Sequence, residues 1–246
     1  MSLRAIIPLC VCGAALAAGT AGAAPSAAPP RASAPPPVAG CVPHGADYRE
    51  AGSRRRHAVA LTFDGGPTAA YTPHVLAQLR KAGAHATFFL RGQFIPGHEA
   101  RLRMQRREGH ELANHSFSHP HFPSTAELLR TTRLIRHATG FTPCLFRAPY
   151  GSVDGALIGR AHAQRMLTIG WDVDSWDSLY ENLSASTIED RVLHNVRPGS
   201  IILMHDGEGS HPGTLRALGP ILRGLRRRGL RVVTVSELLG LRERTG

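Results

Sequence analysis

The chain has 246 residues, with 29 Lys or Arg, 18 Asp or Glu and 14 His, which gives a formal net charge of +11. Lys81 is the sole lysine, so nearly all of the positive charge is arginine. Such a field favours anionic polymers. Because no aromatic platform or nucleic-acid motif accompanies the arginines, we expect no nucleic-acid partner. An anionic cell envelope fits better, and a merely solvated basic surface is the plainer alternative.

Residues 1–23 have the pattern of a secretory signal peptide. Arg4 supplies the charged start, residues 5–18 form an apolar run, and residues 21–23 offer a small-residue cleavage site. The run is too short and too rich in alanine for a stable membrane span. We therefore expect a secreted protein, extracellular or associated with the cell wall. Residues 24–52 predict an Ala/Pro-rich linker and N-terminal extension, and residues 53–246 are long enough for one domain with a full core.

Four cysteines are present, and two of them, Cys10 and Cys12, would leave with the signal peptide. The remaining two, Cys41 and Cys144, commonly pair in an exported chain, which predicts a disulfide between them. Two free buried thiols are the alternative.

Beyond the extension, short apolar runs alternate with amphipathic helical patterns. Strands are predicted at 58–63, 86–90, 110–113, 144–146, 166–169, 200–204 and 231–235. Helices are predicted at 71–81, 96–108, 124–139, 154–164, 186–196, 214–228 and 237–242. Alternation of this kind implies parallel strands with helices outside them. The fold class is therefore α/β, and a distorted (β/α) barrel with about seven parallel strands fits better than an open doubly wound sheet. No glycine-rich nucleotide-binding motif follows any predicted strand.

His115 and His119 form the most informative pair in the chain. If the segment were helical, residues four apart would share one face, and two imidazoles there could close on one metal ion. Taken alone the pair is weak evidence, because 14 histidines make a chance pair common.

Polar groups that follow other predicted strands strengthen the hypothesis. Functional side chains of such folds collect at the carboxyl ends of the strands. Each residue alone has a plain structural explanation, but their joint position predicts one shared site. The groups are Asp64 after the first strand, the histidine pair after the third, Arg147 after the fourth, Asp174 and Asp177 after the fifth, and His205 with Asp206 after the sixth.

Five ordered motifs carry a resemblance to a known family. They are LTFDGGP at 61–67, HSxxH at 115–119, FRxPYG at 146–151, DxxD at 174–177 and LxHD at 203–206. In order and spacing the chain resembles the polysaccharide deacetylases of the NodB-homology family, carbohydrate esterase family 4, over roughly residues 57–240. The resemblance implies a distorted (β/α) barrel and metal-dependent removal of N- or O-acetyl groups from a sugar polymer. Peptidoglycan, chitin oligomers and acetylxylan are the candidate substrates, and we expect a monomer.

By position, the resemblance assigns four residues to the reaction itself. Asp64 aligns with the catalytic base and His205 with the general acid. Arg147 aligns with the arginine that orients the base, and Asp177 with the carboxylate that holds this arginine. These roles suit amide hydrolysis, in which one group takes a proton from water and another protonates the departing amine.

His115 and His119 align with the family's two metal-binding histidines. Imidazole nitrogen suits Zn²⁺, and Co²⁺ or Ni²⁺ are possible. The family's third ligand is an aspartate at the position that Gly65 occupies here. Three outcomes are open: water fills the vacancy, Asp64 moves onto the metal, or the chain is a silent relative that only binds glycans. Retention of both an acid and a base favours a working site.

The remaining assigned residues would contact the substrate. Tyr150 aligns with the residue whose backbone N–H helps to form the oxyanion hole, with Pro149 beside it. Leu203 aligns with the leucine that lines the pocket for the acetyl methyl group. The family's groove tryptophan is replaced by Ser178, and Trp176, two residues earlier, is the expected substitute.

Overall fold

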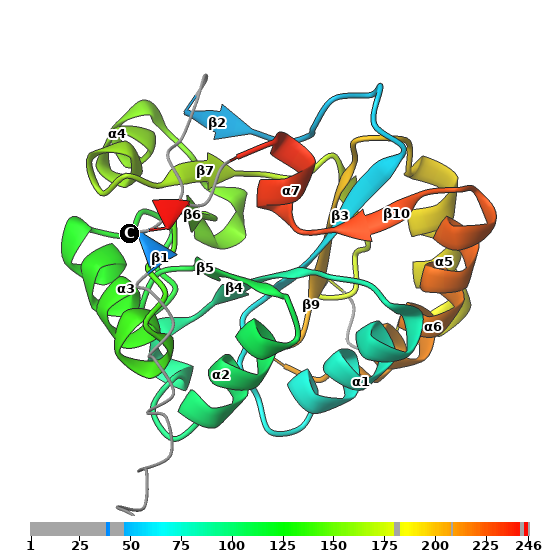
Figure 1. Ribbon diagram of the computed structural model, residues 1–246, viewed down its shortest axis with the longest axis horizontal. Coiled ribbons are helices and arrows are strands. Elements are labelled where there is room, and N and C mark those ends of the chain that lie inside the picture. The colour runs from blue at the N-terminus through cyan, green and yellow to red at the C-terminus, as the bar shows by residue number, and fades with distance from the viewer. Residues whose placement is uncertain (1–37, 40–46, 180–182, 208, 242–243, 246) are drawn as a thin grey trace, which may run out of the picture. The chain divides into compact units, whose positions relative to one another are not determined.

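The structure is a computed structural model that describes residues 38–39, 47–179, 183–207, 209–241 and 244–245 (Figure 1). The predicted signal peptide, most of the predicted linker and Cys41 lie outside these residues. The Cys41–Cys144 disulfide therefore stays a prediction, although Cys144 itself is buried.

A curled parallel sheet forms the centre of the fold, as the alternating pattern predicts. Its strand order is β2-β7-β6-β5-β4-β3-β9-β8, and β10 also pairs with β3. This confirms the distorted (β/α) barrel, with nine strands in the described sheet where about seven were expected. The strands are β2 (Tyr48–Arg49), β3 (Ala58–Asp64), β4 (Thr87–Leu90), β5 (Glu111–Asn114), β6 (Leu145–Phe146), β7 (Leu167–Ile169), β8 (Val173–Asp174), β9 (Ile201–His205) and β10 (Arg231–Val233).

The two additional strands, β2 and β8, are only two residues long, too short to show a period in the sequence. Strand β2 pairs with β7 and lies within the predicted N-terminal extension, so the sheet begins before residue 53. A separate antiparallel pair joins β1 (Val38–Ala39) to β11 (Arg244–Thr245).

Helices surround the sheet in Figure 1 and agree with the predicted ones to within a few residues at most ends. Ser124 caps the helix predicted from residue 124 onward, because its Oγ accepts from Glu127 N. In the described residues, no helix is long and apolar enough to cross a membrane. The helices are α1 (Thr72–Ala82), α2 (Glu99–Arg107), α3 (Thr125–Thr139), α4 (Gly155–Ala163), α5 (Ala185–Asn195), α6 (Pro212–Arg227) and α7 (Val235–Leu239), with 3-10 turns η1 (Gly92–Phe94) and η2 (Pro149–Gly151).

The core explains why the polar groups gather at one end of the strands. Every residue of β3 is buried, as expected of a parallel strand covered on both faces. Phe63 stacks on Phe88 of β4 with ring centroids 5.3 Å apart, while Leu61 and Met204 fill the space between sheet and helices. The interiors of the strands are mostly apolar, and the active-site candidates lie at or just beyond the carboxyl ends.

Candidate active site

The structure brings the predicted site residues to one edge of the sheet, at the carboxyl ends of neighbouring strands. Asp64 ends β3 and pairs in register with His205, which ends β9. Arg147 follows β6, and His115 follows β5. The four side chains are at most 12% exposed, so the charges among them act with little screening by water.

Asp64 is held by Arg147, as the resemblance implies. Arg147 Nη1 donates to Asp64 Oδ1 at 2.8 Å and to Thr62 Oγ1 at 2.7 Å. Its Nε and Nη2 donate to the carbonyls of Ile169 and Gly170. Complete burial lowers the pKa of Arg147, and the Asp64 carboxylate opposes that effect. These hydrogen bonds fix the guanidinium group. The guanidinium occupies Oδ1 of Asp64, while the other oxygen, Oδ2, lies 3.7 Å from His115 Nε2.

His115 and His119 face each other through their Nε2 atoms, 3.1 Å apart. His115 Nδ1 lies 2.9 Å from the carbonyl oxygen of Arg147, which makes Nδ1 the protonated nitrogen and leaves the Nε2 lone pair for a ligand. Burial, with the neighbouring imidazole, lowers the pKa of His119 to about 3. The His119 ring is therefore neutral near pH 7, the form in which histidine binds a metal.

The pair does not lie on a helix, and that expectation is wrong. Residues 115–119 form a loop after β5. In this loop Ser116 and His119 have positive φ angles of 63° and 70°, in the left-handed region. The loop is held by residues that sequence reasoning missed. Asn114 Oδ1 accepts from Ser116 N, and Glu127 Oε2 accepts from the backbone N–H groups of residues 117 and 118. The capping pattern at Ser124 and Glu127 was the available signal.

Asp177 supports His205 rather than Arg147, which corrects the role expected for it. Asp177 Oδ1 lies 2.7 Å from His205 Nδ1, and Oδ2 accepts from His205 N at 2.9 Å and from Thr214 Oγ1 at 2.7 Å. Burial alone would raise the pKa of Asp177, but His205 and these hydrogen bonds outweigh it, so the pKa is lowered. Arg147 instead donates from Nε and Nη2 to the backbone carbonyl oxygens of Ile169 and Gly170. A sequence does not show which backbone carbonyls a side chain will meet.

The predicted substrate residues surround this cluster. Tyr150, in η2, has a left-handed φ of 58° and is 64% exposed; its ring stacks on His121 and meets His119 edge-on. Pro149 beside it is buried, and Leu203 on β9 is 5% exposed. Trp176 is 38% exposed, with the Arg191 guanidinium over its ring. Exposed aromatic rings near buried acids and bases are suited to contact sugar rings.

Asp206 is a second buried carboxyl that was noted in the motif but given no role. Its Oδ2 accepts from Thr72 Oγ1 at 2.6 Å, and burial, with Asp64 nearby, raises its pKa to about 7. A Cβ at Gly66 would lie 2.5 Å from Asp206 Oδ1, so glycine is required there. Asp206 thereby fixes the segment that follows Asp64.

The donor set fits a divalent ion with two protein ligands. Two nitrogens that each bind at about 2.0–2.1 Å in a tetrahedral shell lie a little over 3 Å apart, as the two Nε2 atoms do. Gly65 adds no ligand, and no three His, Cys, Asp or Glu side chains form a metal-binding group within the described parts of the chain. The histidines would therefore hold an ion with most of its coordination positions open.

Comparisons with known proteins identify relatives of the chain. The polysaccharide deacetylase family matches residues 51–167. A peptidoglycan-N-acetylglucosamine deacetylase of Bacillus cereus is 33% identical over 198 residues, 78% of this chain and 71% of that protein. The crystal structure of the Bc1960 peptidoglycan N-acetylglucosamine deacetylase superposes with a TM-score of 0.76 at 31% identity, covering 80% of this chain and 94% of that one.

A third comparison is with a relative that is described as a pseudoenzyme. A CE4-family pseudoenzyme from Bacillus anthracis superposes with a TM-score of 0.72 at 30% identity, over 78% of this chain and 68% of that one. A mutant of that pseudoenzyme has restored enzymatic activity.

The parallel (β/α) barrel and these relatives place the chain in the class of carbohydrate-active hydrolases. Within that class, the chain belongs to the polysaccharide deacetylase family.

Proposed function

We propose that the protein is a secreted, metal-dependent deacetylase that removes N-acetyl groups from N-acetylglucosamine residues of a cell-wall glycan such as peptidoglycan. One observation carries the proposal. Asp64, the candidate base, and His205, the candidate acid, end adjacent strands in register. Each has a buried partner: Arg147 donates to Asp64, and Asp177 lies against the imidazole of His205. A protein that only bound glycans would have no need for this arrangement.

Asp64 would accept the proton of the attacking water. Arg147 Nη1 donates to Asp64 Oδ1, so Oδ2 is the oxygen that can accept the proton. Water adds to the acetamide carbon, and the carbonyl oxygen becomes an oxyanion. The Tyr150 backbone N–H would donate to that oxyanion, while Leu203 would pack against the acetyl methyl group.

His205 would complete the reaction by protonating the amine as the carbon–nitrogen bond breaks. Asp177 accepts from Nδ1–H, which orients the ring and balances its positive charge when Nε2 is also protonated. The products are acetate and a free amino group; Asp64 gives its proton to solvent and His205 regains one from solvent, so both groups return to their starting states.

His115 and His119 would hold the divalent ion, Zn²⁺ in preference, with Co²⁺ or Ni²⁺ as alternatives. When bound, the ion supplies Lewis acidity that polarises the acetyl carbonyl, a poor electrophile by itself. The Arg147 carbonyl on His115 Nδ1 keeps Nε2 available for this purpose.

The test is acetate release from N-acetylated chitooligosaccharides and from peptidoglycan, with Zn²⁺ or Co²⁺ added. Asp64→Asn keeps the shape of the side chain and should lower the rate by about 10²–10⁴-fold. Asp190→Asn, on the exposed face of α5, is the matched control and should leave it unchanged. For the metal, His115→Gln should abolish Co²⁺ binding measured by calorimetry, whereas exposed His137→Gln should not.

A catalytically silent glycan-binding protein is the second candidate, and Gly65 favours it. A site without its charged ligand binds metal more weakly, and a pseudoenzyme relative exists. If the wild-type protein binds chitooligosaccharides but releases no acetate at any metal concentration, the deacetylase proposal is wrong and the second candidate holds.

Export is part of the proposal and rests on the pattern in residues 1–23. N-terminal sequencing of the protein from the culture medium or the wall fraction should find a chain that begins near residue 24. An intact Met1 in cytosolic fractions would contradict export.

A further inference from the structure

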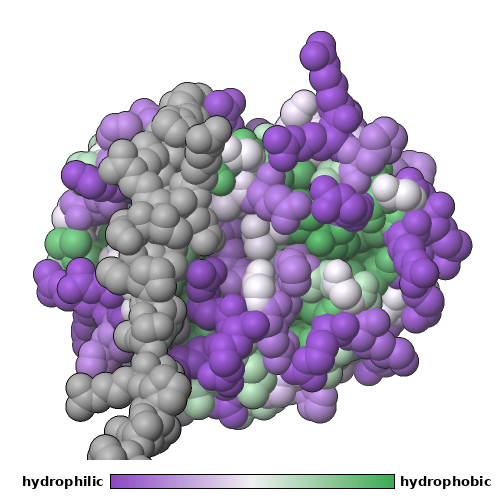
Figure 2. All heavy atoms as spheres, in the orientation of Figure 1, coloured by the Kyte–Doolittle hydropathy of each residue, from purple (hydrophilic) through white to green (hydrophobic). Residues whose placement is uncertain are grey.

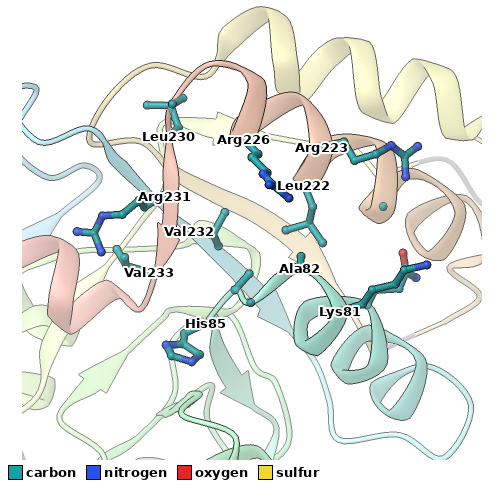
Figure 3. Close-up of a pocket in the computed structure, with 15 residues that line it drawn as sticks. Lys81, Ala82, His85, Leu222, Arg223, Arg226, Leu230, Arg231, Val232 and Val233 are labelled. Carbon is teal, nitrogen blue, oxygen red and sulfur yellow. The ribbon is translucent and has the colours of Figure 1, made fainter.

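A cavity of about 800 Å³ lies away from the candidate active site, beside α1, α6 and β10 (Figure 3). Its walls come from the C-terminal ends of α1 and α6, the turns that follow them, and β10 itself. These turns lead into β4 and β10, so the cavity lies toward the amino ends of the strands, whereas Asp64 and His205 lie at the carboxyl ends. The lining residues are Gln78, Lys81, Ala82, Gly83, Ala84, His85, Gly219, Leu222, Arg223, Arg226, Gly229, Leu230, Arg231, Val232 and Val233.

The cavity combines an apolar floor with a cationic rim. Leu222, Leu230 and Val233 are less than 9% exposed and form its floor with neighbouring alanines. Lys81, Arg223, Arg226 and Arg231 are exposed around it. Figure 2 shows green, apolar surface recessed among purple, hydrophilic side chains in the region of β10, α1 and α6. A ligand with both an apolar face and negative charge would match both parts.

Among the residues that the structure describes, no acidic side chain lines the cavity. Lys81, Arg223 and Arg226 form no ion pair with a described residue, while Arg231 shares an exposed contact of 3.3 Å with Glu237. The C-terminal ends of α1 and α6 each carry only about half a negative charge, which four cations exceed.

Compensation of helix dipoles does not account for this set of cations. It explains basic residues in a helix's last turn, such as Lys81 and Arg226. Arg223 lies before the last turn of α6, and Arg231 lies on a strand. Arg226, the first of three consecutive arginines at 226–228, thus lines a formed cavity.

We propose that this cavity binds an anionic segment of a cell-envelope sugar polymer. Arginine forks bind carboxylate or phosphate groups along the polymer, and the apolar face of a sugar ring packs on the floor. The cations surround a cavity large enough for a molecule rather than a single ion. The site would hold the protein on the envelope while the opposite strand ends remain open to substrate, and it functions whether or not the chain deacetylates.

The experiment measures binding of fluorescent oligogalacturonate, a sugar chain with carboxylates, by anisotropy at low ionic strength. The variant Lys81→Gln/Arg223→Gln/Arg226→Gln should bind about tenfold more weakly than the wild type. The matched control, Arg107→Gln/Arg133→Gln/Arg136→Gln, removes the same charge from exposed positions on α2 and α3 and should bind nearly as well as the wild type. An equal loss in both variants would show attraction by net charge alone and overturn the proposal.

Two further measurements test the apolar floor. Ala82→Trp, at the exposed end of α1, places a bulky ring in the cavity without changing charge and should also weaken oligogalacturonate binding. Inorganic polyphosphate supplies charge without a sugar and should be less sensitive to Ala82→Trp. If Ala82→Trp leaves oligogalacturonate binding unchanged, the cavity is not the binding site. Unchanged circular dichroism and melting temperature verify that each variant folds.

Discussion

The site has two histidine clusters, the His115–His119 pair and His205 with Asp177, and they differ in the group that lies against the Nδ1 atom of the imidazole. At His115, Nδ1 donates to a backbone carbonyl, and Nε2 faces a second imidazole. At His205, Nδ1 lies against the carboxylate of Asp177. A neutral partner leaves a neutral ring that can bind a metal, whereas a carboxylate partner stabilises the charge that a proton carrier acquires.

The difference shows that residue type alone does not assign a role. Both clusters contain histidines at the carboxyl ends of strands of one sheet, and both appear as histidine-containing motifs in the sequence. The partner atoms, a carbonyl in one case and a carboxylate in the other, separate the proposed ligand from the proposed acid. Changing those partners is therefore the direct way to test the comparison.

The largest effect is expected from Asp177→Asn, which removes the charge beside His205. Asp177 accepts three hydrogen bonds, and an amide that keeps its oxygen toward His205 N and Thr214 must turn its NH₂ toward Nδ1. His205 would then carry its proton on Nε2 in the neutral form, the wrong tautomer for the cycle. We expect a loss of roughly a thousandfold in kcat/KM with metal affinity unchanged.

The readout that separates positioning from folding is the pH–rate profile. The limb assigned to the acid should shift in Asp177→Asn, while the variant's Co²⁺ affinity stays at the wild-type value. If metal affinity falls together with the rate, the two clusters are not independent, and the comparison fails.

Next in size is the gain expected from Gly65→Asp, which would add charge to the neutral cluster. Gly65 has a φ of 85°, and Asp and Asn tolerate the left-handed region better than most residues. A carboxylate ligand should raise Zn²⁺ affinity by about a hundredfold, measured by competition with a chromophoric chelator. Gly65→Asn has the same shape without the charge and serves as the control. Equal affinity in the two variants would mean that the added residue is not a ligand.

The sequence predicted the fold and the set of site residues because both depend on local patterns. Apolar runs in alternation with capped helices identified the parallel barrel, and polar residues after those runs marked the strand ends. Asp64, His115, Arg147 and His205 meet there as expected.

The partners within the site could not be predicted, because they depend on three-dimensional contacts. Arg147 bonds to carbonyls of residues 169 and 170, which any residue type provides. Asp177 turns to His205 because β8, too short to have a visible period, runs beside β9. The histidine loop is left-handed at two non-glycine residues, a conformation that no spacing rule indicates.

A smaller effect is expected from Glu127, which supports the histidine loop from α3. Its Oε2 accepts from the backbone N–H groups of Phe117 and Ser118, and Oε1 accepts from Ser118 Oγ. Glu127→Ala leaves these donors without their acceptor and should weaken Co²⁺ binding by about tenfold. Glu127→Gln keeps one acceptor oxygen and should recover most of the affinity. If both variants bind as the wild type does, the loop is positioned without Glu127.

The smallest effect concerns Asp206. Like the two histidine clusters, Asp206 and Asp177 are residues of one type whose different partners give them different protonation behaviour. Asp177 receives three donors and has a lowered pKa, whereas Asp206 receives one side-chain donor, from Thr72, and burial raises its pKa to about 7. Asp64 and His205 are the charged groups that act on it.

Because the unfolded chain loses this proton near pH 4, the folded state holds one more proton between about pH 4 and pH 7. Stability should therefore fall as pH rises through that window. Asp206→Asn does not titrate, so its unfolding free energy relative to the wild type should rise over the window, by more than ~1 kcal/mol, and then stay level. Urea unfolding at several pH values measures this, with Asp190→Asn as the exposed control. A constant difference across pH 4 to 8 would show that Asp206 is ionised throughout, and that burial does not raise its pKa.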